Sequence, residues 1–217
     1  MRKLTVFILI FFMFSGLLHS QQDEIFKHRL NSMTETSFRE TCRRLSQHPF
    51  VRGNFEQEKT IKRLNRSLKS SGSFIIAASL GMVWDTVNPF PSTLVLGRDF
   101  IIQSRPGGQR TSVSAQGNET FLRIAAVISS VFTGNAQGLI DNFEIYYSER
   151  GASWEMALIP LDRAINSFAN MIIMNGDAVI KSIQITEQNN DTIKYALSNH
   201  SFPGALSENE NGLFTIP

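Results

Sequence analysis

Residues 50–103 constrain the fold of this chain more than any other stretch. They form short runs rich in β-branched and aromatic residues, and Gly, Pro, Asn and Ser separate the runs. In the first run Val51 and Phe55 alternate with Arg52 and Asn54, which is the period of two that a strand requires. The pattern predicts antiparallel strands at 50–59, 67–78, 81–86, 92–96 and 99–104, which begin a wide sheet.

The second half of the chain continues the pattern. Strands are predicted at 143–149, 153–161, 168–174, 179–186 and 192–199. Asn175-Gly176-Asp177, between two of them, is a strong hairpin signal. Residues 105–118 are polar and rich in glycine, which predicts a loop, and 213–217 form an apolar tail. The expected fold class is therefore α+β, with about ten antiparallel strands and two substantial helices.

Two segments have helical character. Residues 23–48 place apolar side chains near helical spacing, with a break expected near 34–36, and Ser37 and Glu40 have the spacing of a capping box. Residues 118–132 are apolar nearly all round, so this helix cannot lie with one side in water. It is also too short to span a bilayer. Either the core encloses it, or one face packs on the sheet while the other lines a cavity for an apolar ligand.

The first twenty residues differ in kind from the rest. A short basic start is followed by an apolar run from Leu4 to Leu18, and Ser20 is a small residue suited to cleavage. A membrane anchor is the alternative, but the run is shorter than a spanning helix needs. We therefore expect residues 1–20 to be a signal peptide and 21–217 to be one exported domain. Cys42 does not stand at the first mature position, so no lipid anchor is expected.

Charge and chemistry exclude several classes of function. Removing Arg2 and Lys3 with the leader takes Lys+Arg from 21 to 19, equal to the 19 Asp+Glu, so no basic domain remains to bind nucleic acid. Cys42 is the single cysteine, expected to be buried, with a reactive thiol as the alternative. The sequence contains no zinc, phosphate-binding or catalytic motif. We therefore expect neither an enzyme nor a metal or cofactor site.

What the chain has in excess is adaptable apolar side chains. Phe occurs 13 times after Gln21, together with five Met and both Trp residues. An ordinary core would account for these. However, the strand at 67–78 is apolar on both faces, with Phe74 and Ile76 opposite Ile75 and Ala77. Together with the apolar helix, this favours a carrier of an apolar ligand.

Several short motifs, in order, resemble the LolA-type periplasmic carriers of outer-membrane lipoproteins. In the first half they are Gly53-Asn54-Phe55-Glu56-Gln57, Gly72-Ser73-Phe74-Ile75-Ile76, Met82-Val83-Trp84 and Thr93-Leu94-Val95-Leu96. In the second half they are Met156-Ala157-Leu158-Ile159-Pro160-Leu161-Asp162, 180–186, Thr192-Ile193-Lys194-Tyr195 and Leu213-Phe214-Thr215-Ile216-Pro217. The resemblance extends over residues 24–217.

The resemblance implies an incomplete β-barrel with helices as a lid over its concave face, and a cavity for lipoprotein acyl chains between them. It implies a monomer that takes cargo from an inner-membrane lipoprotein-releasing ABC transporter and passes it to an outer-membrane acceptor. The residues expected to line the cavity are Phe55, Phe74, Ile76, Ala78, Met82, Trp84, Leu94, Leu96, Phe121, Leu122, Ala125, Ile128, Phe132, Met156 and Leu158.

The chain departs from the family at one informative point. Many members have an Arg-Pro pair after the second strand, and this arginine bonds to the lid and holds the cavity shut. Ala78-Ser79 stand there in this sequence. We therefore expect a lid held mainly by apolar packing. The departure leaves two alternatives, a carrier of another lipid or acyl compound, and a non-catalytic signalling or interaction module on the same fold.

Overall fold

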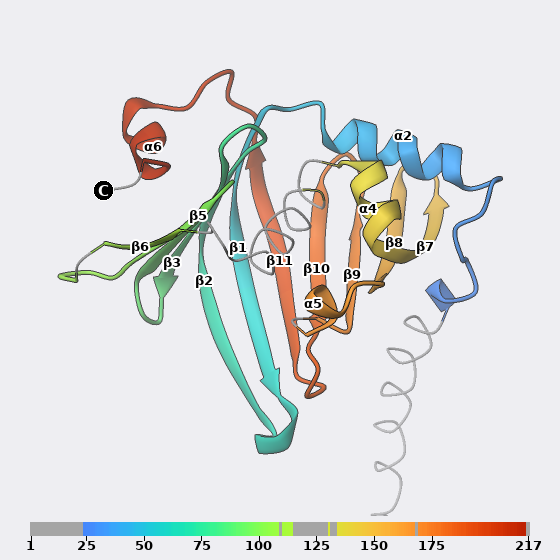
Figure 1. Ribbon diagram of the computed structural model, residues 1–217, viewed down its shortest axis with the longest axis horizontal. Coiled ribbons are helices and arrows are strands. Elements are labelled where there is room, and N and C mark those ends of the chain that lie inside the picture. Colours follow the sequence, from blue (N-terminus) through green and yellow to red (C-terminus); the bar gives the residue numbers. More distant parts are fainter. Residues whose placement is uncertain (1–23, 109, 115–129, 131–133, 168, 216–217) are drawn as a thin grey trace, which may run out of the picture.

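One antiparallel sheet of eleven strands dominates the computed structural model, which describes residues 24–108, 110–114, 130, 134–167 and 169–215 (Figure 1). The strands are β1 (Phe50–Ile61), β2 (Arg66–Ala77), β3 (Gly81–Asn88), β4 (Ser92–Gly97), β5 (Phe100–Ser104), β6 (Thr111–Ser114), β7 (Phe143–Arg150), β8 (Ser153–Pro160), β9 (Met171–Gly176), β10 (Ile180–Thr186) and β11 (Thr192–Ser201). Their order across the sheet is β6-β5-β4-β3-β2-β1-β11-β10-β9-β8-β7.

The strand order shows how the two halves of the chain join. Strands β1 to β6 run outward as a meander, and β7 to β11 return as a second meander that ends beside β1. Phe55 in β1 lies opposite Leu197 in β11, so the centre of the sheet is made by residues distant in sequence. Strands β6 and β7 are the outermost strands of the sheet. The predicted class, an incomplete antiparallel barrel with helices, is confirmed. The additional strand, β6, lies within residues 105–118, which were expected to form a loop.

Side-chain alternation divides the sheet into two faces. We call the face with Phe55 and Phe74 the inner face, and the face with Arg52 and Ile75 the outer face. On the inner face α2 (Glu35–Leu45) and α4 (Ala136–Asn142) lie across the end of the sheet that contains β7, β8 and β9 (Figure 1). Helix α4 and two more short helices, α5 (Arg163–Asn166) and α6 (Glu208–Leu213), were not predicted. Because α5 occupies the connection after β8, the strand expected at 168–174 begins only at Met171.

The N-terminal segment is the clearest error of the helix prediction. Residues 23–48 do not form a helix with one short break, because the backbone near His28 and Leu30 bonds to β7 instead. Leu30 N–H donates to the carbonyl of Ile145, and Tyr147 N–H donates to the carbonyl of His28, both at 2.8 Å. The expected capping box is also wrong, since Thr34 occupies the N-cap position. These bonds satisfy backbone groups that a helix would otherwise have satisfied.

The outer face is also covered, at both ends of the sheet. Ala77, Val83, Val95 and Ile102 pack against Leu206 and Phe214 of the C-terminal segment. Near the other edge, Ile25 packs against Ala157 and Ile173. The prediction that β2 is apolar on both faces is thus confirmed, and its outer face is covered by the C-terminal segment. The expected tail is partly helical, because Ser207 and Glu210 form a capping box that starts α6.

An ion pair holds α6 to the sheet and predicts a pH dependence. Arg52 Nη2 lies 2.6 Å from Glu210 Oε2, and hydrogen bonds from Arg52 and Ser207 lower the pKa of Glu210 from 4.5 to about 2. A lowered pKa means that this stabilisation is present above pH 4.5 and is lost as the pH falls towards about 2. We expect Glu210→Gln to lower the free energy of unfolding by about 1 kcal/mol at neutral pH. The difference from the unsubstituted protein should disappear at the acid end of this window, which urea unfolding at several pH values would show.

Candidate functional site

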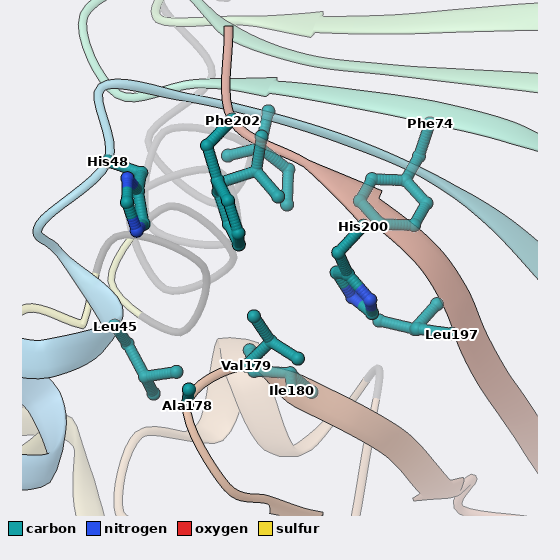
Figure 2. A pocket seen from close by; sticks show the side chains of 11 residues that line it. Leu45, His48, Phe74, Ala178, Val179, Ile180, Leu197, His200 and Phe202 are labelled. Atoms are coloured by element: carbon teal, nitrogen blue, oxygen red, sulfur yellow. The ribbon is translucent and has the colours of Figure 1, made fainter.

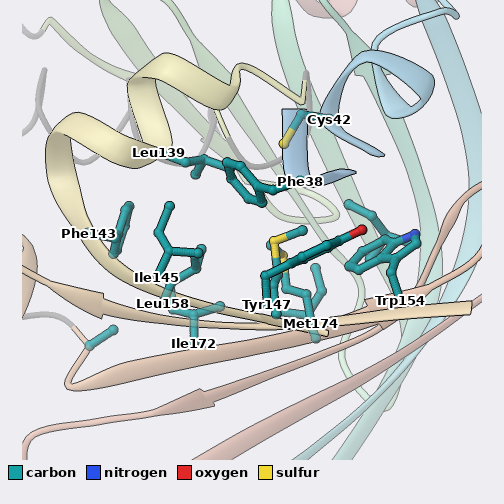
Figure 3. Close-up of a cluster of buried hydrophobic side chains, with 14 of the residues drawn as sticks. Phe38, Cys42, Leu139, Phe143, Ile145, Tyr147, Trp154, Leu158, Ile172 and Met174 are labelled. Carbon is teal, nitrogen blue, oxygen red and sulfur yellow. The ribbon is translucent and has the colours of Figure 1, made fainter. Parts of the chain in front are cut away.

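The best-packed part of the inner face lies under α2. Phe38 is fully buried and meets the Tyr147 ring edge to face, with the ring centroids 5.6 Å apart. Cys42, one helical turn further on, is buried in the same cluster, which Leu139 of α4 joins (Figure 3). Burial raises the pKa of the Cys42 thiol to about 12. A thiol that stays protonated is a poor nucleophile, so Cys42 acts as an apolar packing residue.

Polar groups also fasten α2 to β7. The hydroxyls of Thr41 and Tyr147 lie 2.7 Å apart, and Arg44 donates both to Thr41 and to the Glu149 carboxylate. Burial is the main cause that raises the pKa of Tyr147, so the phenol remains neutral. The lid was expected to be held mainly by apolar packing. The segment expected to act as the lid, residues 121–132, lies outside the described residues except for Ser130, so that expectation stays a prediction. Helix α2 itself is held by the apolar contacts of Phe38 and Cys42 together with hydrogen bonds and an ion pair that the sequence did not indicate.

A row of aromatic side chains extends along the inner face away from α2. The Phe55 and Trp84 rings stack with centroids 4.2 Å apart, and Phe74 stacks on Trp84 at 5.8 Å. Tyr195 of β11 meets the Trp84 ring at 5.2 Å in an edge-to-face arrangement. Four strands thus contribute to one aromatic surface, because the register places Phe55 between β2 and β11. Such rings present broad apolar contact area with few rotatable bonds.

The members of this row differ in burial. Phe55 and Phe74 are each 1% exposed, whereas Trp84, Tyr195 and Met82 are only partly buried. Desolvation raises the pKa of Tyr195 to about 12, and no described residue forms a hydrogen bond with its hydroxyl. Phe55 and Phe74 are therefore structural, while Trp84, Tyr195 and Met82 retain surface that an apolar ligand could cover.

At the α2 end the row leads to a small cavity of ≈ 30 Å³. Leu45 and His48 lie on one side of it and Phe74, Leu197 and His200 on the other (Figure 2). A volume of this size admits about one water molecule, so nothing as large as an acyl chain enters this cavity unless its walls separate. The walls are Leu45 at the C-terminal end of α2, His48 in the segment that follows it, the inner face of the sheet, and the chain at the β9–β10 turn and just after β11. Movement of α2 away from the sheet would therefore enlarge the cavity.

The two histidines of the cavity are held differently. The His48 ring stacks on Phe202 with centroids 3.9 Å apart. His200 is more enclosed, and burial lowers its pKa despite its hydrogen bond to the backbone of Ile180. A lowered pKa keeps this imidazole uncharged at neutral pH. The cavity wall is therefore apolar or neutral around Phe74, which suits an uncharged ligand.

Most of the residues expected to line the cavity come together. Phe55, Phe74, Ile76, Met82, Trp84, Met156 and Leu158 belong to one cluster on the inner face. Leu96 and Leu94 lie on the same face, opposite Met82 and Trp84 in the register, and Leu94 is 39% exposed. Ala78 lies apart from the others, because β2 ends at Ala77 and Ala78 is exposed in the following turn. Phe121, Leu122, Ala125, Ile128 and Phe132 lie outside the described residues.

Sequence reasoning missed the part of the inner face that β11 and β10 provide. Tyr195 and Leu197 complete the aromatic row and the cavity, and Ile183 packs in the same cluster. The alternation of Ile193, Tyr195 and Leu197 was a usable signal for one apolar face. What the alternation could not reveal was the neighbour of that face, since β11 pairs with β1 about 140 residues earlier in the chain.

Among the residues that the structure describes, no group of His, Cys, Asp and Glu side chains is placed to hold a metal ion. Within the same residues, no helix has the length and apolar character to cross a membrane. The arrangement on the inner face offers apolar contact and aromatic stacking. Its chemistry is that of a binding surface for an apolar ligand.

Comparison with known proteins agrees with the sequence resemblance. The family model described as "Outer membrane lipoprotein carrier protein LolA" matches residues 47–216, well over half of the chain. No curated protein matches the sequence at a significant level.

Solved structures show a distant likeness. A putative outer membrane lipoprotein-sorting protein domain from Vibrio parahaemolyticus is 10% identical, with 85% of this chain and 100% of that chain covered and a TM-score of 0.44. A LolA superfamily protein from Nitrosomonas europaea is 7% identical, with 84% and 97% covered and a TM-score of 0.45. The lipoprotein LppX from Mycobacterium tuberculosis is 10% identical, with 82% and 100% covered and a TM-score of 0.46.

Proposed function

The chain belongs to the LolA family of outer membrane lipoprotein carriers, and from this premise we propose that it binds the acyl chains of lipoproteins on its inner face. In this proposal the protein is exported, works in the periplasm and carries its cargo without catalysing a reaction. It receives the lipoprotein from an inner-membrane ABC transporter and passes it to an outer-membrane acceptor. Neither nucleic acid nor a cofactor takes part.

The observation that carries the proposal is the partly buried aromatic surface of Trp84 and Tyr195 beside Met82. A lipid-modified protein cannot leave a membrane unaided, since each CH₂ group exposed to water costs about 0.8 kcal/mol. A carrier must offset that cost and still release its cargo. Flat rings and an unbranched thioether suit this task, because they adapt to chains of variable shape without fixing one geometry.

The cavity beside α2 supports the same function. Its ≈ 30 Å³ would be the closed form of a larger site between α2 and the sheet. Thr41, Arg44 and Phe38 hold this form together through contacts to β7. A closed site of adaptable residues would keep the apolar surface covered while the carrier is empty. Cargo would then enter by displacing the helix.

Tryptophan fluorescence provides a direct test, because the chain has two tryptophans in different places. Trp154→Phe leaves Trp84 as the only reporter, and Trp84→Phe leaves Trp154, which is 2% exposed on β8. We expect a brominated triacyl lipopeptide to quench Trp84 strongly, since acyl chains would lie against its ring. Trp154, whose indole N–H donates to the Asp177 carbonyl, should be quenched less. Urea unfolding of both variants would verify that each is folded.

The same experiment separates the alternatives. A free fatty acid or phospholipid that quenches Trp84 while the triacyl lipopeptide does not would indicate a carrier of another lipid. Absence of quenching by every acyl compound, with calorimetry also showing no binding, would contradict the proposal. That result would leave a non-catalytic interaction module as the remaining interpretation of this fold.

A further inference from the structure

The β1–β2 hairpin extends beyond its neighbours at the end of the sheet away from α2 (Figure 1). Both strands are 12 residues long, and Ile61 pairs with Arg66 around the turn Lys62–Asn65. On one side β11 begins opposite Thr60. On the other side β3 ends opposite Ser71, five residues short of Arg66. We call residues 61–68 the hairpin tip. Because the tip projects beyond the neighbouring strands, it would contact a flat surface before the rest of this end of the sheet.

The hairpin tip combines positive charge with exposed leucines. Lys62, Arg63 and Arg66 are exposed, and none forms an ion pair with a described residue. Leu64 is 53% exposed and Leu68 is 56% exposed. The sequence contains no acidic residue between Lys59 and Asp85. Cations interleaved with exposed apolar side chains are the chemistry by which proteins adhere to anionic lipid bilayers.

The nearest carboxylates on neighbouring strands are already engaged. Asp191 is 5% exposed and accepts a hydrogen bond of 2.8 Å from the Lys62 backbone N–H. Glu187 accepts two bonds of 2.9 Å from Lys59. Glu58 lies opposite Lys69 in the register and is therefore next to a cation of its own. These contacts fix the hairpin tip against the β10–β11 turn and leave its three outer cations without a partner, so little ordering is needed before it binds.

We propose that the hairpin tip docks on an anionic phospholipid bilayer. Leu64 and Leu68 enter the headgroup region, and Lys62, Arg63 and Arg66 contact lipid phosphates. The proposal is independent of the acyl-binding function, because the inner-face residues Trp84 and Tyr195 take no part in it. An acidic protein surface would satisfy the cations, but it would not account for two leucines left in water at the same tip. A lipid bilayer satisfies both.

Vesicle binding by the cargo-free mature protein tests the proposal. We expect the protein to co-sediment with vesicles that contain phosphatidylglycerol and not with vesicles of phosphatidylcholine alone, and added salt should weaken the binding. Each neutralised cation should lower the partition coefficient about fivefold. The combined variant Lys62→Gln, Arg63→Gln, Arg66→Gln should therefore bind about a hundredfold more weakly. Leu64→Ser with Leu68→Ser should also weaken binding, and this loss should persist at high salt.

A control variant replaces an exposed cation and an exposed apolar side chain that both lie away from the hairpin tip. Arg98→Gln with Met33→Ser changes an exposed cation in the β4–β5 turn and an exposed methionine two residues before α2. Gly97 pairs with Gly81, so Arg98 lies at the opposite end of the sheet from the hairpin tip. This control should bind vesicles as the unsubstituted protein does. Equal binding by the tip variants, or no binding of the unsubstituted protein to anionic vesicles at low salt, would overturn the proposal.

The lipopeptide titration distinguishes this proposal from the function proposed above. Tip variants that lose vesicle binding should still show quenching of Trp84 by the triacyl lipopeptide. If quenching is absent from every form of the protein while vesicle binding follows the hairpin tip, the carrier function fails and the docking proposal stands. If quenching persists and vesicle binding is indifferent to the tip, the docking proposal fails alone.

Discussion

Replacing Phe38 with alanine should lower the free energy of unfolding by about 3–5 kcal/mol, the range for truncating a fully buried phenylalanine. Phe38 is 0% exposed and is the largest buried side chain of α2, in one core cluster with residues of the sheet. Its ring lies edge to face on Tyr147, so the substitution removes both the buried area and the aromatic pair. The cavity left behind would sit under the helix that closes the inner face.

Urea unfolding measures this loss, and the chain supplies a matched control. Phe90 is 80% exposed, so Phe90→Ala makes the same chemical change where nothing is buried. We expect the control to stay within about 0.5 kcal/mol of the unsubstituted protein. A loss of similar size in both variants would show that Phe38 is not the anchor of α2. If α2 is the gate, Phe38→Ala should also accelerate release of a bound acyl dye.

The strands could be predicted from sequence because their signal is local. Alternation in residues 50–59 and 81–86 depends only on which side chains point to each face, and the structure keeps both faces as expected. The order of the strands in the sheet could not be predicted in the same way. Pairing of β1 with β11 has no local signal, and only the resemblance to a known family indicated an incomplete barrel. The same gap explains why Tyr195 and Leu197 were absent from the predicted site.

The helix prediction failed in the N-terminal segment because residues at helical spacing are buried there against two different faces of the sheet. Ile25 and Leu30 recur near helical spacing, but they bury against different faces of the sheet. Ile25 packs on the outer face with Ala157 and Ile173, while Leu30 packs against the core of the inner face. A helix cannot serve both faces, so the chain crosses the sheet edge in extended form and bonds to β7. Hydrophobic periodicity indicates which residues are buried, but it does not indicate which element covers them.

The prediction that Ala78 lines the cavity continued the side-chain alternation of β2 one residue beyond the end of the strand. Phe74 and Ile76 lie on the inner face, and the same alternation would place Ala78 beside them. The strand has already ended, because Leu80 N–H donates to the carbonyl of Ala77 in a turn. Ala78 N–H instead donates to the carbonyl of Pro49, close to the start of β1. Ala78 therefore lies beside the chain that leads from α2 to β1.

Gly72→Ala is the second substitution with a large expected effect, since it disturbs the wall that carries the aromatic row. A Cβ at this position would lie 1.9 Å from the carbonyl oxygen of Asp85, which is backbone and cannot rotate away. The register between β2 and β3 shifts at this point, so β3 approaches Gly72 closely. Separating the two strands should cost about 3 kcal/mol, the upper part of the range for overpacking. Because Trp84 lies two residues from the altered pair, its ring should also lose its stacking on Phe55.

Two measurements would check this result, with a substitution at a glycine whose surroundings leave room for a Cβ as the control. Urea unfolding should show the loss of stability, and the emission of Trp84 in the Trp154→Phe background should move to longer wavelength as its ring meets water. Gly204→Ala is the control, since no atom lies within 4 Å of a Cβ there and its backbone is not in the left-handed region. That control should be neutral or slightly stabilising, because alanine restricts the unfolded chain. Unchanged emission in Gly72→Ala would mean that the sheet absorbs the methyl group without moving Trp84, and that the aromatic row does not depend on the close contact of β2 with β3.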